Sequence, residues 1–408
     1  MKINKAKLAI LCGFSMCAFA DDLQSFKNCI GSAGSGDCFL DPGPLSGGAY
    51  SINETLTIGR SNFILQSSMS PAILRRAPGF QGPLMSIGGD SNAPNSNVTI
   101  QLVTFDGNRY GGGSSVSNGE LEVGPYCTSC GVKVNTFQDS PHIALAISPQ
   151  AFKTDVRYNS FSGAYHFGIW SGTGNCGGDP YFRCLYVYTN HFDNIGTNAI
   201  FLTSSRANLG YNTLNGNHRE CSYDAPGGQI DLDLGANDVQ VFWNTITSGP
   251  SCSNQFWAQG VELHGTNIQV YDNIISGNAG EGIYMEQAQN VSIYSTDSSR
   301  YIRSNNVRGS GFPGCGGFPG VRVHSYSGAG FRPTQNISVT NLSSIDGHSW
   351  GVEVSACPSS TQNANNITVS SNCFRGNQNL GGNNGVNVIG SVSGLSIGGN
   401  VTSGCGPI

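Results

Sequence analysis

The sequence predicts an all-β solenoid, a fold in which short parallel strands stack coil upon coil. Two repeated phrases support this prediction. A small residue followed by an apolar, any, apolar, any pattern recurs around eight positions: Ile169, Ile200, Ile230, Val261, Ile283, Val321, Val352 and Val386. A second phrase, apolar-x-apolar-x-x-Asn, ends on ten asparagines: Asn135, Asn159, Asn190, Asn212, Asn244, Asn273, Asn306, Asn341, Asn372 and Asn400. Two strand phrases at a recurring spacing are typical of a solenoid.

The composition indicates a folded repeat rather than disorder. Of the 408 residues, 57 are Gly and only 11% are charged, but 38% are hydrophobic. Disorder requires low hydrophobicity together with high net charge. Because a solenoid adds coils without enlarging a central core, the length does not require several domains.

The chain begins with the pattern of a secretory signal. Lys2, Lys5 and Lys7 precede an apolar run that ends in Ala18-Phe19-Ala20. We expect residues 1–20 to be a signal peptide that is cleaved after Ala20. The run is shorter than the roughly 20 apolar residues of a membrane-spanning helix. We therefore expect a secreted protein, extracellular or periplasmic, without a membrane partner.

Export also determines the expected state of the cysteines. Twelve of the 14 Cys follow the signal, and an even number in an exported protein indicates disulfides. Neighbours in sequence suggest six pairs, although spacing alone does not fix them: Cys29–Cys38, Cys127–Cys130, Cys176–Cys184, Cys221–Cys252, Cys315–Cys357 and Cys373–Cys405.

The rest of the chain divides into a cap and one solenoid domain. Residues 21–50 show few periodic strands, and we expect them to cover the apolar end of the first coil. Residues 51–408 are expected to form the solenoid. Copies of the first phrase lie 22 to 38 residues apart, so we expect insertions at the turns. The recurring Asn is expected to point inward and to form an amide ladder between coils.

These features resemble the right-handed parallel β-helix of the pectin-lyase-like superfold. The resemblance covers roughly residues 51–405 and rests on the repeat and the Asn ladder. The segment Asp106-Gly107-Asn108-Arg109 is also similar to polysaccharide-active members. The resemblance implies a single-domain β-helix and a secreted polysaccharide-degrading enzyme. Because this fold hosts hydrolases, lyases, epimerases, esterases and adhesins, the function has to be argued from a site.

The outward positions of the first phrase locate a candidate site. Alternation places every second residue on the outer face, and neighbouring strands lie about 4.8 Å apart. Four consecutive coils then present eight side chains that we call the site column: Asp231, Asp233, Glu262, His264, Tyr284, Glu286, Arg322 and His324. Trp170, Phe201 and Glu353 hold equivalent positions on neighbouring coils. Four stacked carboxylates repel one another unless a substrate, a proton or a cation compensates.

Paired carboxylates favour a glycoside hydrolase as the main hypothesis. In such enzymes one carboxyl group donates a proton and the other activates water or attacks carbon. We assign catalysis to Asp231, Asp233, Glu262, His264 and Glu286. We assign substrate binding to Trp170, Phe201, Tyr284, Arg322, His324 and Glu353. By analogy with polygalacturonase-like hydrolases, we expect inversion of configuration.

Two alternatives stay open. A β-eliminating polysaccharide lyase needs a base for the C5 proton and a neutraliser for the uronate carboxylate, often Ca²⁺ or cationic side chains. Arg322, His264 or His324 with Tyr284 could supply these groups, and the carboxylates could hold Ca²⁺. The absence of any Lys after Lys153 and an acidic groove disfavour this hypothesis. The second alternative is a non-catalytic glycan-binding adhesin.

The charge balance limits the partners. Without the signal the chain has 17 basic and 25 acidic residues, and no basic patch is evident in the sequence. Nucleic acid is therefore an improbable partner. We expect a polysaccharide substrate, a monomer, and no metal or other cofactor unless a lyase requires Ca²⁺.

Overall fold

The structure is a computed structural model of the chain, and its contacts define two compact units. One unit is Met1–Tyr165 with Cys176–Tyr186, and the other is His166–Asn175 with Val187–Ile408. The predicted boundaries after residues 20 and 50 remain predictions. The structure describes residues 18–20, 22–31, 36–43, 45, 48–68, 70–88, 94–111, 119–174, 183–219, 227–249, 258–305, 319–325, 331–355, 364–378, 384–390 and 392–403.

In the first unit the strand β1 (Ala18–Ala20) precedes α2 (Leu23–Gly31), and the chain continues as parallel strands with a short 3-10 helix η1 (Arg109–Gly111). One sheet consists of β1 (Ala18–Ala20), β2 (Cys38–Leu40), β5 (Phe63–Ser67), β9 (Val98–Gln101), β13 (Gly131–Lys133) and β16 (Thr154–Arg157). Another consists of β3 (Ala49–Ile52), β6 (Ala72–Arg76), β10 (Val103–Asp106), β14 (Thr136–Gln138) and β17 (Ser160–Ser162). The remaining strands are β4 (Leu56–Ile58), β7 (Met85–Ile87), β11 (Gly119–Val123) and β15 (Ile143–Ile147), with the pair β8 (Asn95–Ser96) and β12 (Cys127–Thr128).

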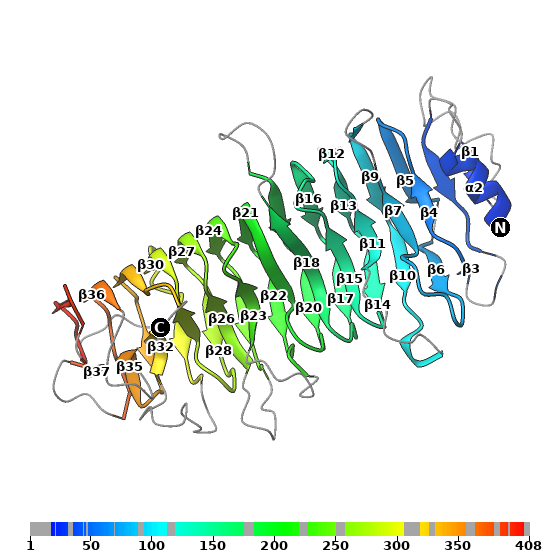
Figure 1. Cartoon of the computed structure of the whole chain (residues 1–408). Coiled ribbons are helices and arrows are strands. Elements are labelled where there is room, and N and C mark those ends of the chain that lie inside the picture. Colours follow the sequence, from blue (N-terminus) through cyan, green and yellow to red (C-terminus); the bar gives the residue numbers. More distant parts are fainter. Residues whose placement is uncertain are drawn as a thin grey trace. The chain divides into compact units, whose positions relative to one another are not determined.

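The second unit repeats the same coil with three parallel strand rows (Figure 1). Sheet 1 consists of β18 (Phe167–Gly174), β21 (Ile200–Gly210), β23 (Gly227–Leu232), β26 (Ala258–Leu263), β29 (Ile283–Glu286), β32 (Pro319–His324), β35 (Trp350–Ser355) and β37 (Val386–Ile389). Sheet 2 consists of the second half of β21, then β24 (Asn237–Phe242), β27 (Thr266–Tyr271), β30 (Gln289–Tyr294), β33 (Gln335–Thr340), β36 (Asn365–Ser370) and β38 (Ser396–Gly398). Sheet 3 consists of β20 (His191–Asp193), β22 (Thr213–Asn215), β25 (Thr245–Thr247), β28 (Ile274–Ser276), β31 (Ile302–Arg303) and β34 (Ile345–Asp346). The short strand β19 (Leu185–Tyr188) precedes β20 in sequence.

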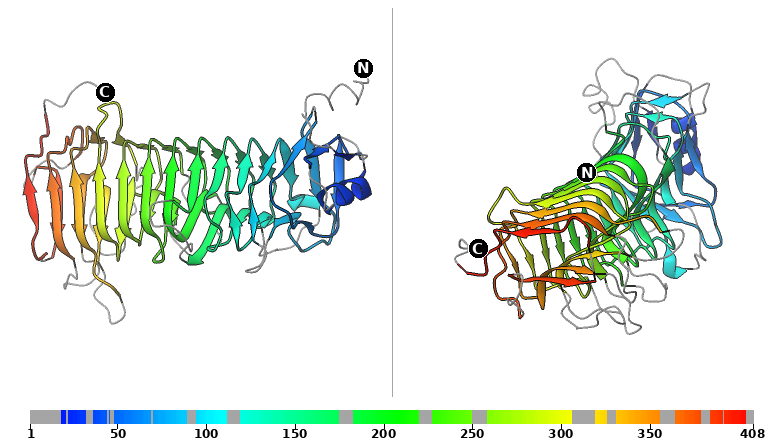
Figure 2. Two further views of the ribbon diagram at one scale, coloured as in Figure 1. Left: turned by 90° about the horizontal axis from the view of Figure 1, so that it is seen from above. Right: turned by 60° about the vertical axis from the view of Figure 1, so that its left-hand side comes forward.

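The core of the second unit is built from the apolar positions of the first phrase. Ile230, Val261, Ile283 and Val321 are paired in sequence order across sheet 1, and all are buried. The stacked strands are visible from two further directions in Figure 2, where those of this unit run from green to red. The prediction of a parallel β-helix is therefore confirmed.

The predicted Asn ladder is present inside the coil. In the second unit Asn212 donates its backbone N–H and its side-chain Nδ2 to Asn244 Oδ1, at 2.9 and 3.0 Å. Asn244 makes the same two bonds to Asn273, at 2.9 and 3.0 Å. Each amide thus satisfies buried backbone groups that have no strand partner at the turn. The same bonds link Asn190 to Asn212, Asn372 to Asn400 and, in the first unit, Asn135 to Asn159.

Replacement of Asn244 by Ala is expected to lower the free energy of unfolding by about 1–3 kcal/mol. The change removes the acceptor of the Asn212 N–H, which is then buried without a partner, and such a group costs its full desolvation penalty. Urea unfolding monitored by circular dichroism measures the effect. Ser292→Ala on the outer face of β30 is the matched control, with an expected change within about 0.5 kcal/mol. Equal stability of the two variants would contradict a structural role for the ladder.

The ladder departs from the prediction at one of the described asparagines. Asn341 is exposed and has φ of 55°, and the adjacent Leu342 donates its N–H to Asn372 instead, at 3.0 Å. The phrase was matched one residue early there, so the prediction for Asn341 was wrong. Asn306 lies outside the described residues.

Two predicted disulfides are present among the described residues, Cys29–Cys38 and Cys127–Cys130. Cys184 and Cys373 are also disulfide-bonded. Their expected partners Cys176 and Cys405, and both members of Cys221–Cys252 and Cys315–Cys357, lie outside the described residues. In the part of the chain that the structure describes, no helix combines the length and apolarity needed to cross a membrane.

Candidate functional site

The site column lies on four consecutive strands of sheet 1, in the predicted register. Asp231 pairs with Glu262 across β23 and β26, Glu262 pairs with Tyr284 on β29, and Tyr284 pairs with Arg322 on β32. Because the phrase alternates with period two, the second residue of each strand follows on the same outer face. The backbone therefore brings together all eight residues that the sequence grouped.

An acid and imidazole cluster occupies the first two strands. Glu262 is almost fully buried, and it accepts hydrogen bonds from the Gly228 N–H at 3.0 Å and from His264 Nε2 at 2.9 Å. Burial opposes charge on the His264 ring, but the hydrogen bond and charge of Glu262 raise the pKa of His264 to about 9. His264 is therefore an imidazolium at neutral pH, and its side chain is 17% exposed.

Asp231 differs chemically from Glu262 although the two are paired. Burial, and then the negative charge of Glu262, raise the pKa of Asp231 well above its ordinary value. Its Oδ2 accepts a hydrogen bond from Asn198 at 3.4 Å, and its buried Oδ1 has no hydrogen-bond partner. These surroundings favour the protonated acid, which can donate a hydrogen bond that a carboxylate cannot.

A tyrosine and carboxylate pair occupies the third strand. The Tyr284 hydroxyl donates to Glu286 Oε2 at 2.7 Å, and Tyr284 is only 1% exposed, whereas Glu286 is partly exposed. Burial raises the pKa of Glu286, although the Tyr284 bond and the charge of His264 oppose the shift. The Tyr284 ring stacks on His324 with centroids 5.9 Å apart. Tyr284 thus holds Glu286 in place from below the surface.

Burial and then the charge of Arg322 lower the pKa of His324 to about 4. His324 is completely buried, so its ring is neutral at neutral pH. A buried neutral ring stacked under Tyr284 serves as support. We therefore assign His324 a packing role in place of the predicted substrate contact.

Arg322 and Glu353 form a buried ion-pair network with Glu281, a residue that the sequence analysis did not single out. Arg322 donates from Nε to Glu281 at 2.9 Å and from Nη1 to Glu353 at 2.7 Å. The side chains of Arg322 and Glu353 have no exposed area. Asn387 also donates to Glu353, at 2.9 Å. The geometry favours a structural role for both residues over the substrate binding that we predicted.

The other predicted residues remain accessible. Trp170, Phe201 and Asp233 are all partly exposed. Trp170 pairs with Phe201, and Phe201 pairs with Asp231, so the two aromatic rings lead directly to the acid cluster. Phe201 also stacks on Phe167 at 5.0 Å. An aromatic face at this position suits stacking against a sugar ring.

Arg332 is a cation of the site that the repeat did not reveal. It follows the insertion after β32 and donates to Thr266 Oγ1 at 3.2 Å and to the backbone oxygen of His264. Its backbone N–H donates to Gln287 at 3.3 Å. Burial lowers the pKa of Arg332, and the charge of Asp233 opposes this shift. Because Arg332 lies outside both phrases, no periodic signal marks it.

Asp231, Glu262 and His264 are close enough to be tested as metal ligands, since their ligand atoms lie within 4.8 Å of one another. Ca²⁺ takes six to eight oxygen ligands. Two carboxylates and one imidazole supply too few oxygens, and Glu262 already accepts bonds from Gly228 and His264. The residues present therefore do not fit a Ca²⁺ site.

The segment Asp346-Gly347-His348 does not belong to the site. His348 Nε2 accepts the Asn305 N–H at 3.1 Å, and the His348 N–H donates to Asn377 at 3.0 Å. His348 thus lies between Asn305 and Asn377 in a second internal ladder, at a position where another asparagine would be expected. Asp346 pairs with Arg303 at 2.9 Å. Both residues are structural.

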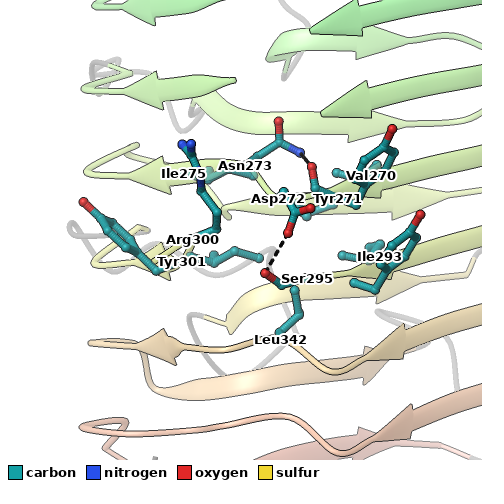
Figure 3. Close-up of a pocket in the computed structure, with 13 residues that line it drawn as sticks. Val270, Tyr271, Asp272, Asn273, Ile275, Ile293, Ser295, Arg300, Tyr301 and Leu342 are labelled. Atoms are coloured by element: carbon teal, nitrogen blue, oxygen red, sulfur yellow. Dashed lines mark hydrogen bonds between the residues drawn. The ribbon is translucent and has the colours of Figure 1, made fainter. Parts of the chain in front are cut away.

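A separate hollow of the second unit surrounds Asp272 (Figure 3). Asp272 accepts hydrogen bonds from Ser295 Oγ at 3.0 Å and from the N–H groups of Thr296 and Asp297 at 2.6 and 3.0 Å. Burial alone would raise its pKa, but the bonds from Thr296 lower the pKa of Asp272 below the ordinary value. The free volume is about 10 Å³, which is room for no more than one water. This hollow anchors a turn and cannot hold a sugar.

Similarity to solved structures is confined to the fold. The A-module of the Azotobacter vinelandii mannuronan C-5 epimerase AlgE6 is 14% identical, with a TM-score of 0.63, and the match covers 97% of this chain and 99% of that one. The chain is a right-handed parallel β-helix. The alginate lyase AlyF-OU02, solved with G6, is 13% identical with a TM-score of 0.58, covering 98% of this chain and 89% of that one.

A further alginate lyase of the same fold, described as PL6 and solved with a trisaccharide, is 15% identical with a TM-score of 0.53. That match covers 97% of this chain and 83% of the lyase. No protein-family model matches the chain, and no curated protein sequence matches it. The likeness therefore shows the parallel β-helix fold alone.

Proposed function

We propose that this protein is a secreted enzyme that cleaves a uronate polysaccharide by β-elimination. One observation carries the proposal. The imidazolium of His264 and the carboxyl group of Glu286 are both partly exposed and belong to neighbouring coils. The pKa of His264 is raised to about 9, and the pKa of Glu286 is raised above its ordinary value. Such a pair supplies an acid and a base to the same substrate.

The elimination follows from these two roles. Ionised Glu286 takes the proton from C5 of the uronate, and the electrons of the C5–H bond form the C4=C5 double bond. The C4–O4 bond breaks, and the leaving oxygen receives a proton from His264. Tyr284 orients Glu286 through its hydroxyl group, and Glu262 orients the His264 ring. Both are positioning residues.

Removing a proton beside a carboxylate requires that its negative charge be compensated. Arg332, which donates to the His264 backbone oxygen, contributes a positive charge to the site. Asp231 in its protonated form adds no negative charge to the site. Trp170 and Phe201 extend the surface along the coil axis and stack on neighbouring sugar rings. This assignment answers the objection that an acidic site would repel the substrate.

Hydrolysis with inversion, the main hypothesis from the sequence, is less well supported by the geometry. Inverting hydrolases separate their carboxyl groups by about 6.5–9.5 Å to admit water, whereas ligand oxygens of Asp231 and Glu262 lie within 4.8 Å. Glu262 is also occupied by Gly228 and His264. The proteins of similar fold reported above are named as an epimerase and two lyases, which suits chemistry at C5 of a uronate.

A product analysis tests the proposal. The purified protein is incubated with polymannuronate, polyguluronate and polygalacturonate, and with neutral glycans as controls. Absorbance of the C4=C5 double bond together with new reducing ends is the expected result, and a chelator is expected to leave the rate unchanged. Reducing ends without absorbance would indicate hydrolysis. Inversion at C5 without cleavage, detected by NMR, would indicate epimerisation. Either outcome, or inactivity on every uronan, overturns elimination.

A further inference from the structure

The first unit contains a basic groove that the sequence analysis did not anticipate. It has a volume of about 270 Å³ and is lined by the outer faces of β9, β13 and β16, with Lys133, Lys153 and Arg157 among its residues. Lys133 and Arg157 are paired in register on neighbouring strands. The expectation that the chain has no basic patch was therefore wrong, because stacking of the coils brings Lys133 beside Lys153 and Arg157, which follow it by 20 and 24 residues in the sequence.

A glycine lies beneath the Lys133 side chain at the groove. Gly131 stands at the outward position between Thr99 and Asp155 in the strand register. A Cβ placed on Gly131 would lie 3.0 Å from Lys133 Cε and 3.0 Å from Thr99 Oγ1. Its backbone does not have positive φ, so no turn geometry requires glycine there. The Lys133 side chain thus lies across Gly131, in space that a larger residue at this position would need.

The charges of the groove favour an anion. Asp155 is the one carboxylate among the lining residues, and it contacts Lys133 at 3.3 Å and Arg157. Three cations therefore face one carboxylate, which leaves an excess of two positive charges in a chain whose net charge is −5. The side chains of Lys133 and Arg157 are more than a third exposed, so a ligand can reach them.

We infer that this groove binds the carboxylates of a uronate oligosaccharide. This inference rests on the proposed function. Two cations on adjacent strands lie about 4.8 Å apart along the coil axis, which suits a ligand with repeated anionic groups. The Thr99 hydroxyl can hydrogen-bond to sugar hydroxyls. The Tyr186 ring can stack against the face of a sugar ring.

Affinity electrophoresis in gels containing polyuronate tests the inference by measuring binding and not turnover. All variants carry Glu286→Gln, so that the polymer in the gel is not cleaved. The variant Lys133→Gln/Lys153→Gln/Arg157→Gln is expected to raise the Kd for polyuronate at least tenfold. Gly131→Gln, which keeps every charge but displaces the Lys133 side chain, is expected to weaken binding as well. The control Lys27→Gln/Arg75→Gln/Arg375→Gln removes the same charge elsewhere and is expected to bind as the parent does.

Several outcomes would overturn the inference. These are unchanged binding by both groove variants, an equal loss in the control, retardation in neutral dextran gels, or displacement by polyphosphate at the same concentration as by oligouronate. Thermal unfolding of each variant verifies that it is folded. The two proposals fail separately. If the protein cleaves no uronan but the groove variants lose polyuronate binding, only the proposed elimination is contradicted. If the protein cleaves a uronan but the groove variants bind as the parent does, only the proposed groove is contradicted.

Discussion

His264→Gln and Glu286→Gln are each expected to lower kcat on the polyuronate that the protein cleaves by about 10²–10⁴-fold, the usual contribution of a general acid or base. Gln preserves hydrogen bonding but neither donates a proton to a leaving oxygen nor accepts one from carbon. The unfolding midpoint is expected to change little for Glu286→Gln, because that side chain is partly exposed. Asp238→Asn, also on the second unit and outside the site column, is the matched control and retains full activity.

The pH profile distinguishes these two roles from a merely structural one. The pKa of His264 is raised to about 9, so activity should fall as the pH rises through about 9 and the acid is lost. The raised pKa of Glu286 predicts a second loss on the acidic side. His264→Gln should remove the alkaline limb from its residual activity. An unchanged alkaline limb, or more than a tenth of the parent rate in His264→Gln, contradicts the assignment.

His264 has a linked effect on stability with a defined sign. Its folded-state pKa lies above the ordinary value of 6.5, so its pairing with Glu262 stabilises the fold fully below about pH 6.5. This contribution is lost as the pH rises through about 9. Unfolding is therefore measured for the parent and for His264→Gln at pH 6 and pH 10. The comparison shows whether the loss of activity at alkaline pH comes from catalysis or from a less stable fold.

Arg322→Met is expected to lower the free energy of unfolding by about 3–5 kcal/mol, the cost of removing one partner from a buried charge network. The change leaves Glu281 and Glu353 buried without their shared cation. Urea unfolding measures the loss. Lys27→Met breaks an exposed pair with Glu54 and is expected to cost no more than about 1 kcal/mol.

A second variant separates charge from packing at Arg322. Arg322→Met combined with Glu281→Gln and Glu353→Gln removes all three charges together, and it is expected to regain much of the stability, since replacing a whole buried ion network is often neutral. If Arg322→Met alone costs less than about 1 kcal/mol, Arg322 is not structural, and its predicted role in substrate binding returns.

The sequence predicted the fold and the grouping of the site because both depend on periodicity. Strict alternation fixes which residues point outward, and register slips are excluded wherever one face is buried. The pairing of Asp231 with Glu262 and of Tyr284 with Arg322 follows directly from that rule. The error at Asn341 arose where Leu342 occupies the ladder position and the asparagine precedes it.

The repeated phrase could not predict which outward side chains are buried or which charged residues form ion pairs. The alternation predicts that Arg322 and Glu353 point outward from the coil, but it does not predict that both side chains are buried in the folded protein. Glu281 and Arg332 come from turns and insertions, whose course no repeat specifies. The basic groove was missed for the same reason, since Lys153 lies outside the strands that bear Lys133 and Arg157.

The register of sheet 1 has a consequence for how such a protein can diversify. The spacing of the catalytic side chains is set by the hydrogen-bonded distance between strands, about 4.8 Å, whether the intervening chain is 22 residues long, as between Val261 and Ile283, or 38, as between Ile283 and Val321. Insertions at the turns can therefore lengthen, shorten or change composition without moving His264 relative to Glu286. The turns and the strand residues of the site column can therefore change independently of one another.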